Sequence, residues 1–175
     1  MKNRYSYQDN YYPFTFISHT RVVTRGILLN KHNQVALIHV VCDDDFGHRD
    51  CYETPGGGKK KEETLHQSVL REIKEETGYD AQIICYLGFV EDYYNLINRR
   101  NHNHYYLLRC LEYEHQYLED YEKDVFKDIK FYDIDEAISL MEKVDDDGVG
   151  RLIKQRELPI LRLAKEYINE HPINK

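Results

Sequence analysis

The stretch that decides the fold is Gly57–Tyr79, GGKKKEETLHQSVLREIKEETGY, in which a glycine-rich turn leads into a predicted helix. At about 100° per residue, one apolar stripe runs along this helix: Leu65, Val69 and Ile73. Glu72 and Glu76 lie beside the stripe, where an ordinary helix turns inward. As like charges four residues apart, they destabilise a helix by about 0.2–0.5 kcal/mol unless something neutralises them. The stretch therefore predicts a loop for phosphates and a helix for a divalent cation.

The residues around the helix predict its two ends. The helix should begin near Glu63 or Thr64 and end at Gly78, because glycine commonly ends helices in the left-handed conformation. Before it, Pro55 holds the preceding residue out of the helical region. The glycines at 56–58 remove side chains where the backbone approaches a ligand closely or adopts a positive φ.

The rest of the chain alternates between predicted strands, loops and helices. Four segments rich in β-branched and aliphatic residues indicate strands: 21–29, 34–41, 81–94 and 104–113. The first two form a predicted hairpin. Polar residues indicate exposed loops at 42–52 and at 95–103, the second with two arginines and one histidine.

Two further helices are predicted near the end of the chain. A short strand precedes a helix that begins after Asp133, a predicted N-cap with Glu136 three residues on. A second amphipathic helix covers 151–170, and Pro159 should kink or divide it. Strands on both sides of one helix, with more helices at the end, predict an α/β (α+β) sandwich. We expect residues 1–20 to be an N-terminal arm or edge strand, and 21–175 to form a single domain.

Composition excludes several classes of protein. The length of 175 residues fits one domain, the hydrophobic fraction is 41%, and no apolar run approaches the roughly 18 residues that span a bilayer. The polar, tyrosine-rich N-terminus lacks the apolar core of a secretory signal, so we expect a cytoplasmic protein that is not bound to a membrane. The four cysteines contain no C-x-x-C pair, which indicates neither a zinc knuckle nor a disulfide framework. The net charge of -7 argues against binding to a nucleic-acid backbone.

The glycine turn and helix also follow a known pattern. The stretch Gly57–Tyr79 resembles the Nudix box, G-x5-E-x7-R-E-U-x-E-E-x-G-U, in which U is an aliphatic residue. Eight positions match at the required spacing: Gly57, Glu63, Arg71, Glu72, Ile73, Glu75, Glu76 and Gly78. The one mismatch is Tyr79, at the last aliphatic position. The resemblance implies the αβα sandwich of the Nudix hydrolases, with a mixed central sheet, over residues 21 to about 165.

The resemblance implies a role for each carboxylate. In this family the box binds Mg²⁺, for which Mn²⁺ is a substitute, and positions a diphosphate for attack by water. Glu72, Glu75 and Glu76 would be the catalytic residues. Glu72 and Glu76 would be the main metal ligands, Glu75 would bind directly or through water, and the carbonyl of Gly57 would add a further ligand. Hard cations of this kind take oxygen ligands, and they lower the pKa of the attacking water.

Other positions of the box are implied to be structural, and some depart from the commonest family pattern. By the resemblance, Glu63 and Arg71 pair and hold the loop against the helix. Glu62 replaces a frequent glycine, Lys60 stands where an acid is common, and Tyr52 stands where many members have tryptophan. None of these departures removes a catalytic carboxylate, but they leave the substrate open.

Contacts to the substrate are predicted less directly. The candidate residues are Arg21, Arg25, Tyr52 and Lys59. Arg21 and Arg25 share one strand face and would reach a phosphate, although strand arginines commonly pair with surface acids instead. Lysine runs are usually solvated and tyrosines usually pack, so both readings stay open for Lys59 and Tyr52. A general base would come from a downstream acid, and the sequence does not choose among Glu91, Glu112 and Glu114.

These features together predict a Mg²⁺-dependent Nudix pyrophosphohydrolase. It would cleave a nucleoside diphosphate linked to another moiety, with nucleoside triphosphates or oxidised nucleotides slightly preferred. Family members that hydrolyse ADP-ribose often carry a proline downstream of the box, and here none lies between Pro55 and Pro159. The alternative is a non-catalytic Nudix domain that binds a nucleotide as a sensor or regulatory module, but the intact set of carboxylates favours the enzyme. The expected partner is a small nucleotide-type molecule, and a homodimer stays open.

Overall fold

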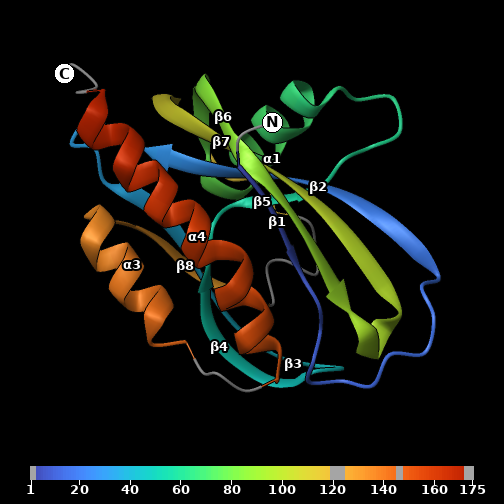
Figure 1. Ribbon diagram of the computed structural model, residues 1–175. Coiled ribbons are helices and arrows are strands. Elements are labelled where there is room, and N and C mark those ends of the chain that lie inside the picture. The colour runs from blue at the N-terminus through green and yellow to red at the C-terminus, as the bar shows by residue number, and fades with distance from the viewer. Residues whose placement is uncertain (1–2, 119–124, 145–147, 172–175) are drawn as a thin grey trace.

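The computed structural model describes residues 3–118, 125–144 and 148–171. In these residues an eight-stranded sheet combines with three helices and one short 3-10 turn (Figure 1). The strands are β1 (Arg4–Tyr7), β2 (His19–Leu29), β3 (Val35–Asp44), β4 (Gly47–Glu53), β5 (Gly56–Gly58), β6 (Tyr79–Tyr94), β7 (Arg99–Tyr113) and β8 (Phe126–Tyr132). The helical elements are α1 (Leu65–Thr77), η1 (Asn95–Ile97), α3 (Ile134–Glu142) and α4 (Gly148–Glu170).

The sheet is mixed, as predicted. Its main order is β1-β6-β7-β2-β3-β4, with β5 paired to β2 and β8 paired to β3. The pairs β1–β6 and β2–β7 are parallel, whereas β6 and β7 are antiparallel. Strand β5 consists of the three glycines of the turn, and it hydrogen-bonds to β2 so that Gly57 lies opposite Thr24. The sheet therefore fixes the start of the glycine turn against the strand that carries Arg21 and Arg25.

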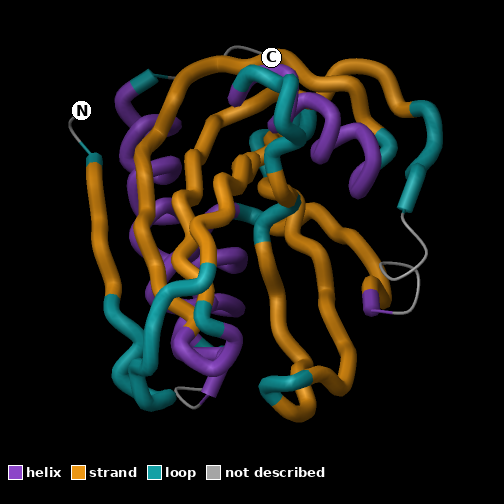
Figure 2. Tube along the Cα trace, turned by 90° about the vertical axis from the view of Figure 1, so that its right-hand side faces the viewer, coloured by secondary structure: helices purple, strands orange, loops and turns teal. Residues whose placement is uncertain are grey.

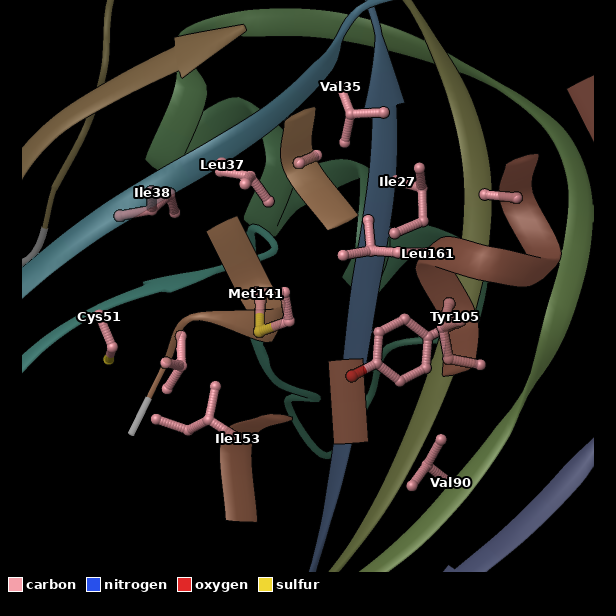
Figure 3. Packing of buried hydrophobic residues seen from close by; sticks show 14 of the residues in the cluster. Ile27, Val35, Leu37, Ile38, Cys51, Val90, Tyr105, Met141, Ile153 and Leu161 are labelled. Atoms are coloured by element: carbon pink, nitrogen blue, oxygen red, sulfur yellow. The ribbon is translucent and has the colours of Figure 1, made fainter. Parts of the chain in front are cut away.

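Two hydrophobic cores lie on opposite faces of the sheet, because neighbouring residues of a strand point to opposite sides. In β2, the fully buried Ile27 belongs to the larger core and the fully buried Leu28 to the smaller one. Helices α3 and α4 cover the larger core, which includes Met141 and Leu161 (Figure 3). Helix α1 covers the smaller core with Ile73. The chain is thus an αβα sandwich, and Figure 2 shows helices on both sides of the strands.

The predicted ends of α1 are confirmed. Thr64 is the N-cap, and it forms a capping box with Gln67, in which each side chain bonds to the backbone of the other residue. Gly78 ends the helix with φ 77°, in the left-handed region that glycine adopts at low cost. The strands predicted at 21–29, 34–41, 81–94 and 104–113 are confirmed as β2, β3, β6 and β7.

Two predicted loops are shorter than expected. Most of 42–52 is a hairpin rather than a loop, because β3 continues to Asp44 and pairs with β4. Likewise β7 begins at Arg99, so only 95–98 connects it to β6. Polar side chains suggested loops in both places, but the backbones pair with neighbouring strands, and such pairing overrides local composition.

The two C-terminal helices also differ from the predictions in detail. Asp133 occupies the N-cap position of α3, but its side chain makes no capping hydrogen bond. Helix α4 continues through Pro159 and is not divided. Its buried residues before and after the proline, such as Ile153 and Ile160, pack in the same core, so tertiary packing holds the two halves together.

The N-terminal residues contribute an edge to the sheet. Strand β1 lies alongside β6, with Arg4 opposite Phe89 and Tyr7 opposite Asp92. The division of the chain into an arm at 1–20 and one domain at 21–175 stays a prediction, and β2 already begins at His19. Within the described residues, none of the helices combines the length and the apolar character that crossing a bilayer requires.

Candidate active site

The glycine turn before α1 is stabilised by a lysine that belongs to the turn itself, Lys59. Lys59 Nζ donates hydrogen bonds to three carbonyl oxygens, those of Lys60 at 2.9 Å, Lys61 at 3.3 Å and Glu63 at 2.7 Å. The N–H of Lys60 donates to Glu63 Oε2 at 2.9 Å. These contacts hold the ammonium of Lys59 inside the turn and stabilise the loop. The ammonium is therefore directed at the loop carbonyls rather than toward a substrate.

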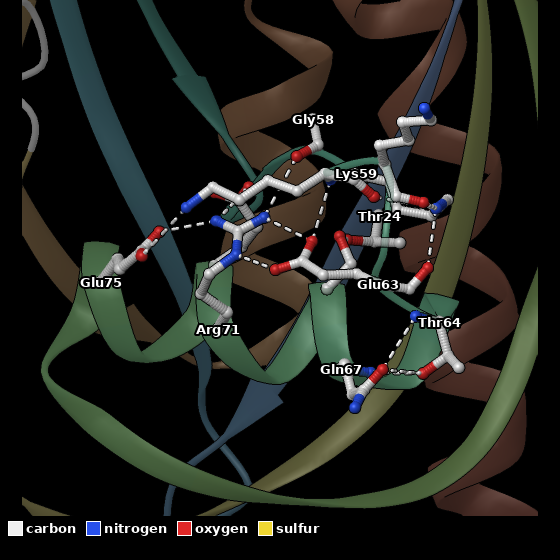
Figure 4. Close-up of polar contacts among 12 residues, drawn as sticks. Thr24, Gly58, Lys59, Glu63, Thr64, Gln67, Arg71 and Glu75 are labelled. Carbon is white, nitrogen blue, oxygen red and sulfur yellow. Dashed lines mark hydrogen bonds and ion pairs between the residues drawn. The ribbon is translucent and has the colours of Figure 1, made fainter.

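Arg71 connects the helix to the same turn (Figure 4). Its Nε and Nη2 donate to the two carboxylate oxygens of Glu63 at 2.5 and 3.0 Å, and Nη2 also donates to the carbonyl of Gly58 at 3.1 Å. Its Nη1 lies 2.7 Å from both Glu72 Oε1 and Glu75 Oε2. The hydrogen bond from Arg71 lowers the pKa of Glu63 to about 2, so this carboxylate is charged at neutral pH. One guanidinium therefore orients three glutamates of the box.

Two glutamates of α1 are buried where the helix meets the turn. Glu72 and Glu76 are only 6% and 4% exposed. Glu76 Oε2 accepts a hydrogen bond from the N–H of Gly56 at 2.6 Å. Gly57 packs so closely on Glu72 that a Cβ at this position would lie 2.6 Å from Oε2. A side chain at Gly57 would therefore displace the carboxylate of Glu72 from this position.

The oxygen atoms where α1 meets the turn are of the type that binds a divalent cation. Carboxylate oxygens and a glycine carbonyl are the hard ligands that Mg²⁺ takes in proteins. In the part of the chain that the structure describes, no three acidic, histidine or cysteine side chains converge into a complete metal site. Arg71 holds Glu72 and Glu75 on its own side, and Glu76 bonds to the turn. The metal-binding and catalytic roles of Gly57, Glu72, Glu75 and Glu76 therefore stay predictions.

A pocket of about 460 Å³ opens beside the glycine turn. Gly56, Gly57 and Glu76 form part of its wall, whereas Glu72 and Glu75 do not line it. Five arginines line the pocket: Arg21, Arg25, Arg49, Arg99 and Arg156. Its acidic lining consists of Asp44, Asp45, Glu53 and Glu76. The box thus supplies one side of a pocket whose other sides carry many positive charges.

Buried acids neutralise three of these arginines. Arg156 donates to Glu53 Oε2 at 2.7 Å and to Glu157 Oε1 at 2.8 Å. Arg25 lies 3.2 Å from Glu53 and 3.6 Å from Glu157, and Arg49 lies 3.6 Å from Glu53. Burial would raise the pKa of Glu53, but Arg156, Arg25 and Arg49 lower it to about 2. Arg25 therefore belongs to this network of ion pairs. This arrangement corresponds to the alternative in which a strand arginine pairs with acids instead of a phosphate.

This network of ion pairs was not predicted from the sequence, although the sequence contains a signal for it. Arg156 and Glu157 are 4% and 0% exposed, and they lie on the apolar stripe of α4 between the buried Ile153 and Ile160. Charged residues on the inward face of an amphipathic helix are rarely buried unless they are paired. The same reasoning identified Glu72 in α1, and it applies equally to α4.

Other predicted site residues lie away from the pocket. Tyr52 stacks on His39, with ring centroids 4.8 Å apart, and it does not line the pocket. Glu91 lies 3.0 Å from His102 Nε2, and Glu114 pairs with a lysine of α1. None of the predicted downstream acids, which also include Glu112, is among the residues that line this pocket.

The αβα sandwich carries, side by side, a helix of glutamates oriented by Arg71 and a pocket lined by five arginines. A family model described as "NUDIX domain" matches residues 19–153, well over half of the chain. The chain belongs to the Nudix family, and the resemblance indicated by the sequence is confirmed. Nudix hydrolases act on phosphoric anhydride bonds, which is the class of enzyme that the sequence predicted.

Curated relatives match only part of the chain. An RNA pyrophosphohydrolase of Zymomonas mobilis is 31% identical over 67 residues, which are 38% of this chain and 41% of that protein. An 8-oxo-dGTP diphosphatase of Proteus vulgaris is 34% identical over 59 residues, which are 34% of this chain and 51% of that protein. The matches thus span about half or less of either relative.

Solved structures match over most of the chain. A Nudix hydrolase from Nitrosomonas europaea superposes with a TM-score of 0.64 at 13% identity, covering 87% of this chain and 90% of that one. A MutT Nudix hydrolase from Burkholderia pseudomallei superposes with a TM-score of 0.56 at 18% identity, covering 67% of this chain and 86% of that one. At these identities the likeness concerns the fold alone.

Proposed function

We propose that this protein is a Mg²⁺-dependent pyrophosphohydrolase. It cleaves a nucleoside diphosphate linked to another moiety, and it prefers nucleoside triphosphates or oxidised nucleotides. The observation that carries this proposal is the position of Glu76: its carboxylate is fixed by the N–H of Gly56 at 2.6 Å, and it faces a pocket lined by five arginines. A buried carboxylate beside a cationic pocket can serve a metal ion and a phosphate at one place.

Each residue of the box has a proposed part in the reaction. Glu72, Glu75 and Glu76 hold the ion, with Mn²⁺ as a substitute for Mg²⁺. When bound, such an ion polarises the phosphoryl group and lowers the pKa of a water ligand. Arg71 fixes the side chains of Glu72 and Glu75 before substrate arrives, and such preorganisation lowers the cost of reaching the transition state. Gly57 presents bare backbone to the diphosphate.

The names of the relatives support the proposed substrate class, since both refer to the cleavage of nucleotide phosphates. Action in the cytoplasm on a small molecule, with or without a homodimer, belongs to the same proposal. The alternative, a domain that only binds a nucleotide, is less favoured because all three box carboxylates are present and oriented.

The test is a panel of substrates with purified protein and Mg²⁺. The panel contains nucleoside triphosphates, 8-oxo-dGTP, 5′-triphosphorylated RNA, nucleotide sugars and ADP-ribose, and phosphate and pyrophosphate release are measured. We expect turnover of one class, abolished by EDTA and restored by Mg²⁺ or Mn²⁺. Binding of a nucleotide by calorimetry without any turnover would instead establish the regulatory alternative.

A further inference from the structure

Two of the pocket arginines lack a negative partner. Arg25, Arg49 and Arg156 are neutralised by buried acids, but the side chains of Arg21 and Arg99 form no hydrogen bond or ion pair with another described residue. Arg99 Nε is buried without any hydrogen-bond partner. Buried donors are normally satisfied, because leaving one unpaired costs about 1–3 kcal/mol. Arg99 therefore has a buried donor without an acceptor, and an anion would supply one.

The register of the sheet brings the two arginines together. In the parallel pair β2–β7, Arg21 lies opposite Asn101 and Arg99 lies opposite His19, so the two arginines are two positions apart on adjacent strands. At a strand spacing of about 4.8 Å and a rise of about 3.3 Å per residue, their Cα atoms are roughly 8 Å apart on one face. Two guanidiniums that line one pocket at this spacing can share a single phosphoryl group.

Neighbouring groups hold both side chains in place. A Cβ at Gly58 would lie 2.9 Å from Arg21 Nε and Nη2, so the guanidinium of Arg21 rests on the glycine turn. The guanidinium of Arg99 lies over the ring of Tyr94, 5.3 Å from its centroid. Arg156 Nη1 in turn donates to the Tyr94 hydroxyl at 2.9 Å, which fixes the ring. Both arginines are thus oriented before a ligand arrives, and such preorganisation lowers the entropic cost of binding.

The charge of this pair also favours an anion. Burial, followed by the positive charge of Arg21, lowers the pKa of Arg99. Repulsion between the two guanidiniums is therefore present in the ligand-free protein. A phosphoryl group bound between them would remove this repulsion and form charge-assisted hydrogen bonds.

The pair lies beyond the end of the glycine turn. Val23 of β2 pairs with Gly58, and Arg21 lies two residues before Val23, which is about 7 Å of strand. Arg99 pairs with His19, two residues further along β2. A phosphoryl group between the two guanidiniums therefore lies further along β2 than a phosphoryl group next to Gly57.

We propose that Arg21 and Arg99 bind a phosphoryl group of the substrate other than the two joined by the scissile anhydride. The substrate class is then a nucleotide with at least three phosphates in a row, rather than a diphosphate linked to an uncharged sugar. This inference rests on the proposed function, because that function defines the substrate. Binding of an anion by the two arginines, however, does not require turnover.

The experiment measures binding of two inorganic probes by calorimetry, in EDTA and at low salt. Tripolyphosphate and pyrophosphate differ by one phosphoryl group. We expect the wild-type protein to bind tripolyphosphate about 10-fold more tightly than pyrophosphate. Arg21→Gln and Arg99→Gln should each remove most of this difference. The matched control is Arg100→Gln on the next position of β7, where the side chain bonds to Thr20 on the opposite face; it should keep the difference.

Two results would overturn the proposal: equal binding of both probes by the wild-type protein, or an equal loss in the Arg100→Gln variant. Loss of preference in only one of the pocket variants would overturn the shared subsite. Thermal unfolding of each variant verifies that it is folded. Because EDTA removes divalent ions, the measurement does not depend on hydrolysis, and a failure of the substrate panel would leave this result unaffected.

Discussion

At the scale of single residues, the candidate site depends on carboxylates that are fixed before any ligand binds. Glu76 is the clearest example, because it is 4% exposed, accepts the Gly56 N–H and lines the pocket. Glu72 and Glu75 are oriented by Arg71 instead. The protein thus uses one backbone donor and one guanidinium to hold three negative charges within a short segment.

Glu76→Gln should therefore abolish turnover without unfolding the protein. The amide oxygen can still accept the hydrogen bond of Gly56, but the negative charge for the ion is lost. We expect kcat to fall by at least about 100-fold, the range that the loss of one group stabilising charge in the transition state produces. The control is Glu62→Gln, an exposed glutamate of the same turn, which should stay within about 2-fold of the wild-type rate. An active Glu76→Gln variant would refute the ligand role.

At the scale of elements, the two helices that follow strands begin differently. The side chain of Thr64 accepts a hydrogen bond from the N–H of Gln67, 3.2 Å away, at the start of α1. Asp133 occupies the same position in α3 without a capping bond. The sequence predicted a cap at Asp133, where no capping bond forms, and only a helix start near Thr64, where a capping box forms.

Removing these caps should have unequal effects. Thr64→Ala should lower the free energy of unfolding by about 1 kcal/mol, because it leaves an N–H of the first turn without its partner. Asp133→Ala, the matched control, should lower it by clearly less. Urea unfolding of both variants measures the two values. Equal losses would show that the capping bond of Thr64 does not contribute as the geometry implies.

Helix α4 contributes charge as well as apolar area. Arg156→Met should destabilise the protein by about 3–5 kcal/mol, because it leaves Glu53 and Glu157 in the interior with one partner fewer. Arg162→Met is the control on the same helix: its pair with Glu142 is about half exposed and should contribute at most about 1 kcal/mol. Urea unfolding compares the two, and similar losses would contradict the importance of the network.

At the scale of the whole molecule, local signals predicted the fold better than the pocket. The spacing of Glu72 and Glu76 beside an apolar stripe predicted a buried acidic helix, since neighbours along one helix determine that pattern. The pairing of β3 with β4 was not predicted, and neither was the placement of Arg21 and Arg99 side by side. They depend on which strands lie side by side, and composition does not encode that register.

The buried network should also determine how stability changes with acid. The folded pKa of Glu53 is about 2, below the ordinary value of 4.5. Its contribution is therefore complete above pH 4.5 and is lost as the pH falls toward 2, and it amounts to about 3 kcal/mol. Thermal unfolding should show a large deficit of Glu53→Gln against wild type at pH 7, and a deficit that shrinks between pH 4.5 and 2. A deficit independent of pH would exclude this charge as its cause.

The contact between Glu53 and Arg156 spans 103 residues of sequence. During synthesis at about 5–20 residues per second, the acid leaves the ribosome roughly 5–20 s before its arginine. For that time Glu53 and the similarly placed Arg25 have not yet met the helix that joins them in the finished pocket. The nascent sheet must therefore keep these charges in water, and the polar interior of the pocket closes only as the last helix docks.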